Sequence, residues 1–181
     1  MTTLEEIAKI IGVAPGRKLK KRILEQLKKV PYVPFPTAFH TVDIIPIVYK
    51  DFGMKILLGR KHNSNEWRFI GGFVEPTNST EEAAARELHE ETNIYIDDLN
   101  RFQYISSQFV DDRRYKQSCH KVTTSIFTIT LTEEEAMQAL GGDDIEEVKW
   151  VDYIEIYSNP NENIISFHIP LFNKFVKYLG L

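Results

Sequence analysis

A pair of glycines followed by a strongly acidic helical segment occupies the middle of this sequence. Gly71 and Gly72 come first, and Ser79 with Glu82 three residues later forms a capping box, which predicts a helix beginning near residue 80. Anions in the first helical turn, here Glu81 and Glu82, are favoured by the helix dipole. Paired glycines let the backbone adopt positive φ or approach a ligand closely. The segment therefore predicts a strand end, a glycine turn and a helix.

Three glutamates on the predicted helix are candidate ligands for a cation. Glu87, Glu90 and Glu91 are spaced i, i+3 and i+4, so their carboxylates lie on one helix face. Like charges at these spacings repel each other, and a bound cation would offset that repulsion. Oxygen ligands without a nearby cysteine favour Mg²⁺ or Mn²⁺. The alternative interpretation is a solvated acidic face, which is the more common arrangement for helical glutamates taken alone.

The whole stretch resembles the Nudix box, a family motif written Gly-x5-Glu-x7-Arg-Glu-U-x-Glu-Glu-x-Gly-U, in which U is apolar. The matching positions are Gly72, Arg86, Glu87, Leu88, Glu90, Glu91 and Ile94. So many matches at fixed spacing are not expected by chance. The resemblance implies an α/β fold, the Nudix-type α/β/α sandwich around a mixed β-sheet. It also implies a pyrophosphohydrolase with Arg86, Glu90 and Glu91 among its catalytic residues.

Two positions depart from the family pattern. Asn93 replaces the glycine after the helix, and asparagine tolerates the left-handed conformation required there. Asn78 replaces a glutamate that the family uses to hold the box arginine, here Arg86, and an amide cannot offer a bidentate charged partner. Glu75 and Glu82 are nearby carboxylates that could take this role. The glutamates tied to metal binding are intact, so we expect activity, with weaker metal affinity as one consequence of Asn78.

Length and composition define the domain organisation that we expect. At 181 residues and 43% hydrophobic, the chain can bury the core of one domain and add an appendage. Pro31 ends the second helical pattern, and residues 32–36, with Pro34 and Pro36, are predicted to form an extended linker. We therefore predict a short N-terminal helical extension and linker over residues 1–35 and a Nudix hydrolase domain over residues 36–181. Residues 17–29 of the extension carry a basic helical face, which is either solvated or an anion-binding surface, and the solvated face is the more common case.

Charge and cysteine content limit the expected partners and compartment. The net charge of −4 gives no electrostatic reason to expect general nucleic-acid binding. The single cysteine, Cys119, cannot form an internal disulfide, and we find no signal peptide and no apolar run long enough to cross a membrane. We therefore expect a cytoplasmic protein with no membrane partner. Because the Nudix family is often dimeric, the resemblance adds a homodimer to these expectations.

Strand patterns outnumber helix patterns outside the box. The predicted turn at residues 51–53 joins strands 39–49 and 54–60, and a short strand at 67–70 leads to the glycines. Further strands are predicted at 102–110, 122–131 and 148–151. Thr132 with Glu135 caps a predicted short helix that reaches about Leu140, and Phe172 and Phe175 belong to the apolar side of a C-terminal helix.

Two loops extend the candidate site beyond the box. The polar loop at residues 111–117 contains basic and aromatic side chains that could bind phosphate, ribose or adenine, and the alternative is a solvated hairpin loop. These candidate substrate-binding residues are Arg113, Arg114 and Tyr115. The acidic loop at residues 141–147 contains candidates for the general base, as does the box itself. These loop candidates are Asp144, Glu146 and Glu147.

The resemblance implies hydrolysis of a nucleoside diphosphate linked to another group, by attack of water on phosphorus. It assigns metal binding to Glu87, Glu90 and Glu91, while the backbone of Gly71 and Gly72 shapes a site for the small-molecule nucleotide substrate. Two segments look like the branch that contains ADP-ribose pyrophosphatases and Nudix domains fused to nicotinamide-mononucleotide adenylyltransferases. They are Phe109–Lys121, which precedes a strand, and Gly142-Asp143-Asp144, a few residues before Lys149-Trp150-Val151. We therefore expect ADP-ribose to be hydrolysed to AMP and ribose 5-phosphate.

Two alternatives to this substrate stay open. One is a Nudix enzyme for another nucleotide, such as a nucleotide sugar, a dinucleoside polyphosphate or a nucleoside triphosphate. The other is a non-catalytic sensor, because this branch includes transcription regulators that bind ADP-ribose-like ligands through a decayed box and add a DNA-binding domain. The intact glutamates and the short extension argue against the regulator, whereas Asn78 and the basic segment 17–29 favour it.

Overall fold

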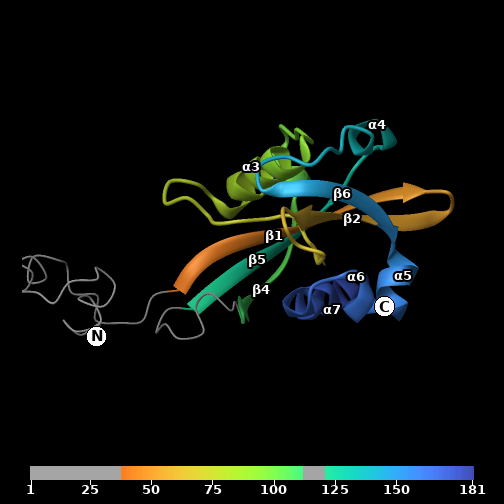
Figure 1. The fold of residues 1–181 in the computed structure, drawn as a ribbon. Helices are drawn as coiled ribbons and strands as arrows, with labels where there is room; N and C mark the ends of the chain where they lie inside the picture. The colour runs from red at the N-terminus through yellow and green to blue at the C-terminus, as the bar shows by residue number, and fades with distance from the viewer. Residues whose placement is uncertain (1–37, 112–120) are drawn as a thin grey trace, which may run out of the picture. The chain divides into compact units, whose positions relative to one another are not determined.

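A mixed β-sheet of six strands organises this computed structural model, which describes residues 38–111 and 121–181 (Figure 1). The strands are β1 (Ala38–Lys50), β2 (Gly53–Lys61), β3 (Trp67–Arg68), β4 (Gln103–Val110), β5 (Lys121–Thr130) and β6 (Ile145–Asp152). Their hydrogen-bonded order is β3-β2-β1-β5-β4, and β6 pairs with β2. Strands β1 and β5 run parallel, whereas the other pairs are antiparallel.

Helices cover both faces of this sheet (Figure 1). On one face lie α3 (Thr80–Thr92) and the short α4 (Glu133–Ala136). On the other lie α5 (Tyr153–Ser158), α6 (Pro160–Asn163) and α7 (Ile169–Tyr178). Two 3₁₀ helices, η1 (Leu99–Arg101) and η3 (Ser166–His168), complete the described elements. The predicted α/β/α arrangement around a mixed sheet is therefore confirmed.

Each sheet face has its own hydrophobic core. Because successive strand side chains point to opposite faces, Ile44 packs in the core that contains α3, while Ile45 packs in the core that contains α7. Leu57 and Leu58 on β2 divide in the same way. The central strands are consequently apolar on both faces, as expected for strands covered by helices on each side.

The β1–β2 hairpin confirms the turn predicted at residues 51–53. Asp51 and Phe52 have positive φ angles of 52° and 63°, and Lys50 pairs with Gly53 across the two-residue loop. Positive φ at both central residues is the type I′ geometry, whose twist matches that of the flanking strands. The hairpin fixes the register of β2, which then leads through β3 to the glycine turn.

Helix α3 begins and ends as its sequence predicts. Ser79 accepts a hydrogen bond from the backbone N–H of Glu82, and the Glu82 side chain accepts one from the backbone N–H of Ser79. Asn93 takes the left-handed conformation, with φ of 59°, and its backbone N–H donates to the carbonyl of His89. Asn93 thus preserves the helix end that a glycine provides in the family motif.

Other predicted boundaries need correction. Strand β6 begins at Ile145, so Glu146 and Glu147 are strand residues; they pair across the sheet with Arg60 on β2. Helix α4 ends at Ala136, short of the predicted end, because the following segment turns back and the Leu140 N–H donates to the end of α3. Helices α5 and α6 were not predicted from the sequence.

Several predictions concern residues that the structure does not describe. These are the helical extension over residues 1–35, its boundary near residue 36, the loop residues Arg113, Arg114 and Tyr115, and Cys119. Among the described residues, no helix combines the length and the apolar character needed to cross a membrane.

Candidate active site

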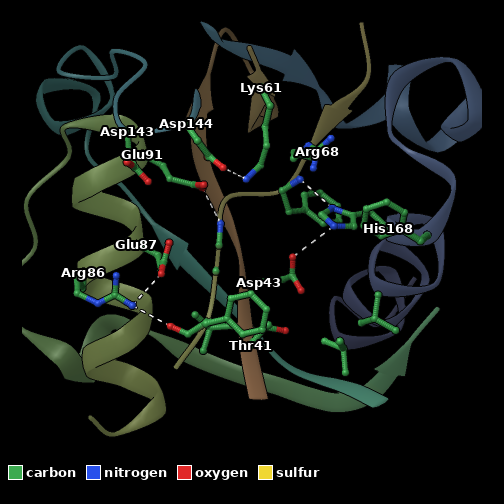
Figure 2. Close-up of a pocket in the computed structure, with 18 of the residues that line it drawn as sticks. Thr41, Asp43, Lys61, Arg68, Arg86, Glu87, Glu91, Asp143, Asp144 and His168 are labelled. Atoms are coloured by element: carbon green, nitrogen blue, oxygen red, sulfur yellow. Dashed lines mark hydrogen bonds and ion pairs between the residues drawn. The ribbon is translucent and has the colours of Figure 1, made fainter. Parts of the chain in front are cut away.

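A polar pocket of about 380 Å³ lies where β1, the glycine turn and α3 meet (Figure 2). It brings together Gly71 and Gly72 with Glu87 and Glu91, as the box pattern predicts. Additional lining comes from β1, β2, the loop before β6 and the segment that leads into α7. The further polar residues in this lining are Thr41, Asp43, Lys61, Arg68, Glu75, Arg86, Asp143, Asp144 and His168.

The two glycines are required by close backbone packing. Gly71 has a φ angle of 151°, and a Cβ placed there would lie 2.1 Å from the carbonyl oxygen of Val42 on β1. A Cβ at Gly72 would lie 2.5 Å from both carboxylate oxygens of Glu87. Any side chain at either position would therefore push the turn away from β1 or displace Glu87.

Glu87 and Glu91 are buried on the side of α3 that faces the glycine turn. Their exposed fractions are 8% and 3%, and the backbone N–H of Gly71 donates to Glu91 Oε2 at 2.8 Å. Burial raises the pKa of Glu91 to about 8, against the opposing effects of the Gly71 hydrogen bond and of Lys61. Burial also raises the pKa of Glu87, although Arg86 opposes this shift. Near neutral pH Glu91 is thus largely protonated.

Asp144, in the loop that precedes β6, adds a third carboxylate to the pocket beside Glu87 and Glu91. It forms an ion pair with Lys61 and lies near enough to Glu91 for each carboxyl group to influence the pKa of the other. Burial would raise the pKa of Asp144, but the hydrogen bond and charge of Lys61 lower it. Glu91 and Asp144 therefore favour opposite protonation states.

Arg86 holds two of the box glutamates. Its guanidinium lies 2.6 Å from Glu90 and 2.8 Å from Glu87, and it donates to the carbonyl of Phe73 at 2.9 Å. The Glu90 side chain is 45% exposed and does not line the pocket. The metal-binding role predicted for Glu90 stays a prediction.

The consequence of Asn78 is visible at the same arginine. The Nε atom of Arg86 is buried without a hydrogen-bond partner. Of the two substitutes suggested by the sequence, Glu82 is engaged in the capping box, and the described ion pairs of Arg86 include neither Glu75 nor Glu82. The position that a glutamate fills in the family motif is therefore not filled by another carboxylate here.

The remaining predicted catalytic residues lie away from this pocket. Glu146 and Glu147 pair with Arg60 at 2.9 and 2.8 Å and do not line it. Their assignment as general base stays a prediction, whereas Asp144, from the same predicted group, does line the pocket.

The pocket wall opposite α3 contains a buried polar group that sequence reasoning missed. Asp43 on β1 accepts a hydrogen bond from the Thr124 hydroxyl at 2.6 Å, and its other oxygen lies 3.5 Å from His168 Nε2. Burial raises the pKa of Asp43 to about 6, and burial lowers the pKa of His168 to about 3. One signal was available in the sequence, because Asp43 interrupts an apolar strand between Val42 and Ile44.

The donor atoms suit a hard divalent cation, although they do not form a complete site. Among the described residues, no group of three or more His, Cys, Asp or Glu side chains is arranged to hold a metal ion. Glu87, Glu91 and Asp144 nevertheless offer carboxylate oxygens in one pocket, the ligand type that Mg²⁺ and Mn²⁺ prefer. A cation bound to Glu91 would replace the proton that burial now favours.

Comparisons with known proteins identify the family and the fold. The family model described as the NUDIX domain matches residues 39–175. Among curated proteins, no sequence matches. Solved structures do match, and at the identities found for them the likeness shows the fold alone.

Three of these structures show the range of the similarity. The NUDIX domain of Shewanella oneidensis NrtR, complexed with ADP ribose, has a TM-score of 0.64 at 20% identity, with 86% of this chain and 97% of that chain covered. A bifunctional NMN adenylyltransferase/ADP ribose pyrophosphatase from Francisella tularensis, complexed with AMP and a manganese ion, has a TM-score of 0.58 at 20% identity, covering 88% of this chain and 47% of that one. The Ap4A hydrolase of C. elegans has a TM-score of 0.56 at 16% identity, covering 79% and 99%.

Proposed function

The chain belongs to the Nudix family, and from that membership and the pocket we propose that it is a metal-dependent pyrophosphohydrolase that cleaves ADP-ribose to AMP and ribose 5-phosphate. One observation supports the hydrolase above all others. Glu87 and Glu91 are buried together against the glycine turn, in a pocket large enough to admit part of a nucleotide. Burying two carboxylates side by side costs folding free energy, and a bound cation would offset that cost.

We assign the roles within the pocket as follows. Glu87 and Glu91 would hold Mg²⁺ or Mn²⁺, with Glu90 joining them if it leaves Arg86. The bound metal would neutralise the diphosphate and lower the pKa of water. Arg86 positions Glu87, and Lys61 lies beside the same carboxylates, where it can attract phosphate oxygens.

Among the general-base candidates we favour Asp144. It lines the pocket, and Lys61 keeps its pKa low, so it stays ionised and can accept a proton from water. Glu146 and Glu147 would first have to leave Arg60. A box glutamate stays an alternative, although the protonation favoured at Glu91 without a cation makes it a poor base in that state.

The choice of ADP-ribose rests on two supports. The Shewanella domain was solved with ADP ribose, and the Francisella protein is described as an ADP ribose pyrophosphatase. In addition, the polar loop at residues 111–117 supplies arginines and a tyrosine, which suit phosphate, ribose and adenine. The single cysteine of the sequence suits the reducing cytoplasm, where we expect the reaction to take place.

A ligand-binding sensor is the second candidate function. It is favoured by the pairing of Glu90 with Arg86, which withholds one box glutamate from the pocket, and by the structural likeness to the NrtR domain. In that case ADP-ribose would bind without being cleaved.

A substrate panel separates these proposals. Purified protein is incubated with Mg²⁺ or Mn²⁺ and with ADP-ribose, a UDP-sugar, a dinucleoside polyphosphate or a nucleoside triphosphate, and products are separated by chromatography. We expect the highest kcat/KM for ADP-ribose. Another nucleotide that is better by ten-fold would overturn the substrate, and binding of ADP-ribose without turnover of any compound would establish the sensor.

A further inference from the structure

The pocket has two chemically different walls (Figure 2). On the α3 side lie the carboxylates of Glu87 and Glu91, which suit a metal and a diphosphate. On the opposite side lie Asp43 and His168, which the proposed hydrolysis does not use. Figure 2 shows Asp43 between α3 and His168, so a ligand that fills the pocket must pass close to it.

Asp43 lies between two side chains, Thr124 and His168, and His168 is itself held in place by Phe69. The Thr124 hydroxyl on β5 donates to Asp43 Oδ2 at 2.6 Å, and His168 Nε2 lies 3.5 Å from Oδ1. The backbone N–H of Phe69 donates to His168 Nδ1 at 3.0 Å, which places the ring proton of neutral His168 on Nε2, facing Asp43. The Phe69 ring also stacks on the imidazole, with centroids 5.3 Å apart.

This arrangement leaves Asp43 able to accept hydrogen bonds from a ligand. A carboxylate has about four acceptor positions, and the two neighbours described here occupy at most two of them. The contact with His168 is long, which leaves Oδ1 available. An ionised acceptor of this kind binds hydroxyl groups strongly.

We propose that Asp43, positioned by Thr124 and His168, accepts a hydrogen bond from a hydroxyl group of the sugar that the diphosphate joins to the nucleotide. The inference rests on the proposed function and specifies which part of the substrate this wall recognises. The phosphates lie toward Lys61 and the α3 carboxylates, and the neutral sugar lies toward Asp43. The same contact selects against a nucleoside triphosphate, whose terminal group is an additional anion.

The test compares two ligands of equal charge. ADP-ribose and the β-methyl ester of ADP both carry a doubly esterified diphosphate, but the ester lacks the second sugar. Dissociation constants are measured by calorimetry with Mg²⁺ present, on analogues of both ligands in which a methylene group replaces the oxygen between the two phosphorus atoms, so that no turnover occurs. The wild-type protein should bind ADP-ribose more tightly than the ester. Asp43→Asn, which keeps the shape of the side chain, should weaken ADP-ribose binding by about ten-fold or more and change binding of the ester by less than about two-fold.

Control variants make the result specific. Asp152→Asn removes an exposed carboxylate from the end of β6, outside the pocket, and should change neither constant. If Asp43→Asn fails to fold, as judged by its melting curve, Thr124→Val replaces it. Loss of the hydroxyl that orients Asp43 should weaken ADP-ribose binding several-fold without affecting the ester.

Two results would overturn the proposal: equal binding of the two ligands to the wild-type protein, or equal changes for both ligands in the variants. Because no turnover is measured, these outcomes are independent of the hydrolysis proposal. If the protein hydrolyses ADP-ribose but Asp43→Asn affects binding of ADP-ribose and of the ester equally, the proposed function stands and only the contact with Asp43 is refuted.

Discussion

Replacing Glu91 by Gln should reduce the pH dependence of stability in the metal-free protein. Glu91 has a pKa of about 8 in the folded chain against an ordinary value of 4.5. A carboxyl whose pKa is raised by folding stabilises the fold while it is protonated, and this contribution is lost as pH rises toward the folded-state value. Between pH 6.5 and 8.5 the unfolded chain already has the ionised group, so folding stability should fall.

The size of the effect follows from the linkage slope. Below the folded-state pKa of Glu91, the free energy of unfolding falls by about 1.4 kcal/mol per pH unit. Between pH 6.5 and 8.5 the ionisation of Glu91 should therefore lower the free energy of unfolding by about 2 kcal/mol. Gln is uncharged over this range. Its amide oxygen can accept from the backbone N–H of Gly71, as Glu91 Oε2 does. The variant should therefore match the wild type at pH 6.5 and exceed it by about 2 kcal/mol at pH 8.5.

Urea unfolding in EDTA at both pH values measures this difference directly. Titrating groups far from the pocket are shared by both proteins, so the difference between wild type and variant reports Glu91 and the carboxylates coupled to it, Glu87 and Asp144. Adding Mg²⁺ at pH 8.5 should restore stability to the wild type and much less to Glu91→Gln, because ligand binding to the folded state stabilises it. Parallel pH profiles for the two proteins would refute the buried, proton-binding state of Glu91 on which the metal assignment rests.

Substitutions at three further places test other parts of the site. Asn78→Glu would give Arg86 Nε a charged partner. It should therefore lower the metal concentration for half-maximal activity, or raise stability by about 1.5–3 kcal/mol at most. An unchanged metal titration together with an unchanged melting temperature would contradict this. Gly72→Ala should displace Glu87 and lower kcat by about ten-fold or more, since its Cβ would lie 2.5 Å from that carboxylate; wild-type kinetics would show that the turn yields freely. Arg113, Arg114 and Tyr115 are replaced by alanine one at a time. At least one of these variants should have a kcat/KM about ten- to a hundred-fold lower than the wild type, with metal dependence unchanged. If none of the three lowers kcat/KM, the loop does not bind the substrate.

The parts of this fold that local chemistry determines were predictable from the sequence. Helix α3 follows from the reciprocal hydrogen bonds of Ser79 and Glu82, and its end follows from the tolerance of Asn93 for positive φ. The hairpin turn at Asp51 and Phe52 was recognisable for a similar reason. In each case the determining contacts lie within a few residues of one another.

Features that depend on distant contacts were not predictable. The early start of β6 depends on pairing with β2, where Arg60 attracts Glu146 and Glu147 from 86 and 87 residues away. The polar wall of the pocket joins Asp43 with Thr124, which is 81 residues later in the chain. Spacing along a helix showed that the box glutamates share a face, but tertiary packing decides which of them line the pocket.

Hydrolysis of ADP-ribose in ¹⁸O-labelled water is the most direct test of the central claim, which is attack of water on phosphorus in the α3 pocket. With Mg²⁺ present, the products should be AMP and ribose 5-phosphate, and mass spectrometry should find one ¹⁸O on the phosphate of one of them. Glu91→Gln should lower this turnover by about 100-fold or more, because weakening even a supporting partner of a metal ligand costs about 10- to 100-fold. Formation of ADP and ribose, or equal turnover by wild type and variant, would contradict the account.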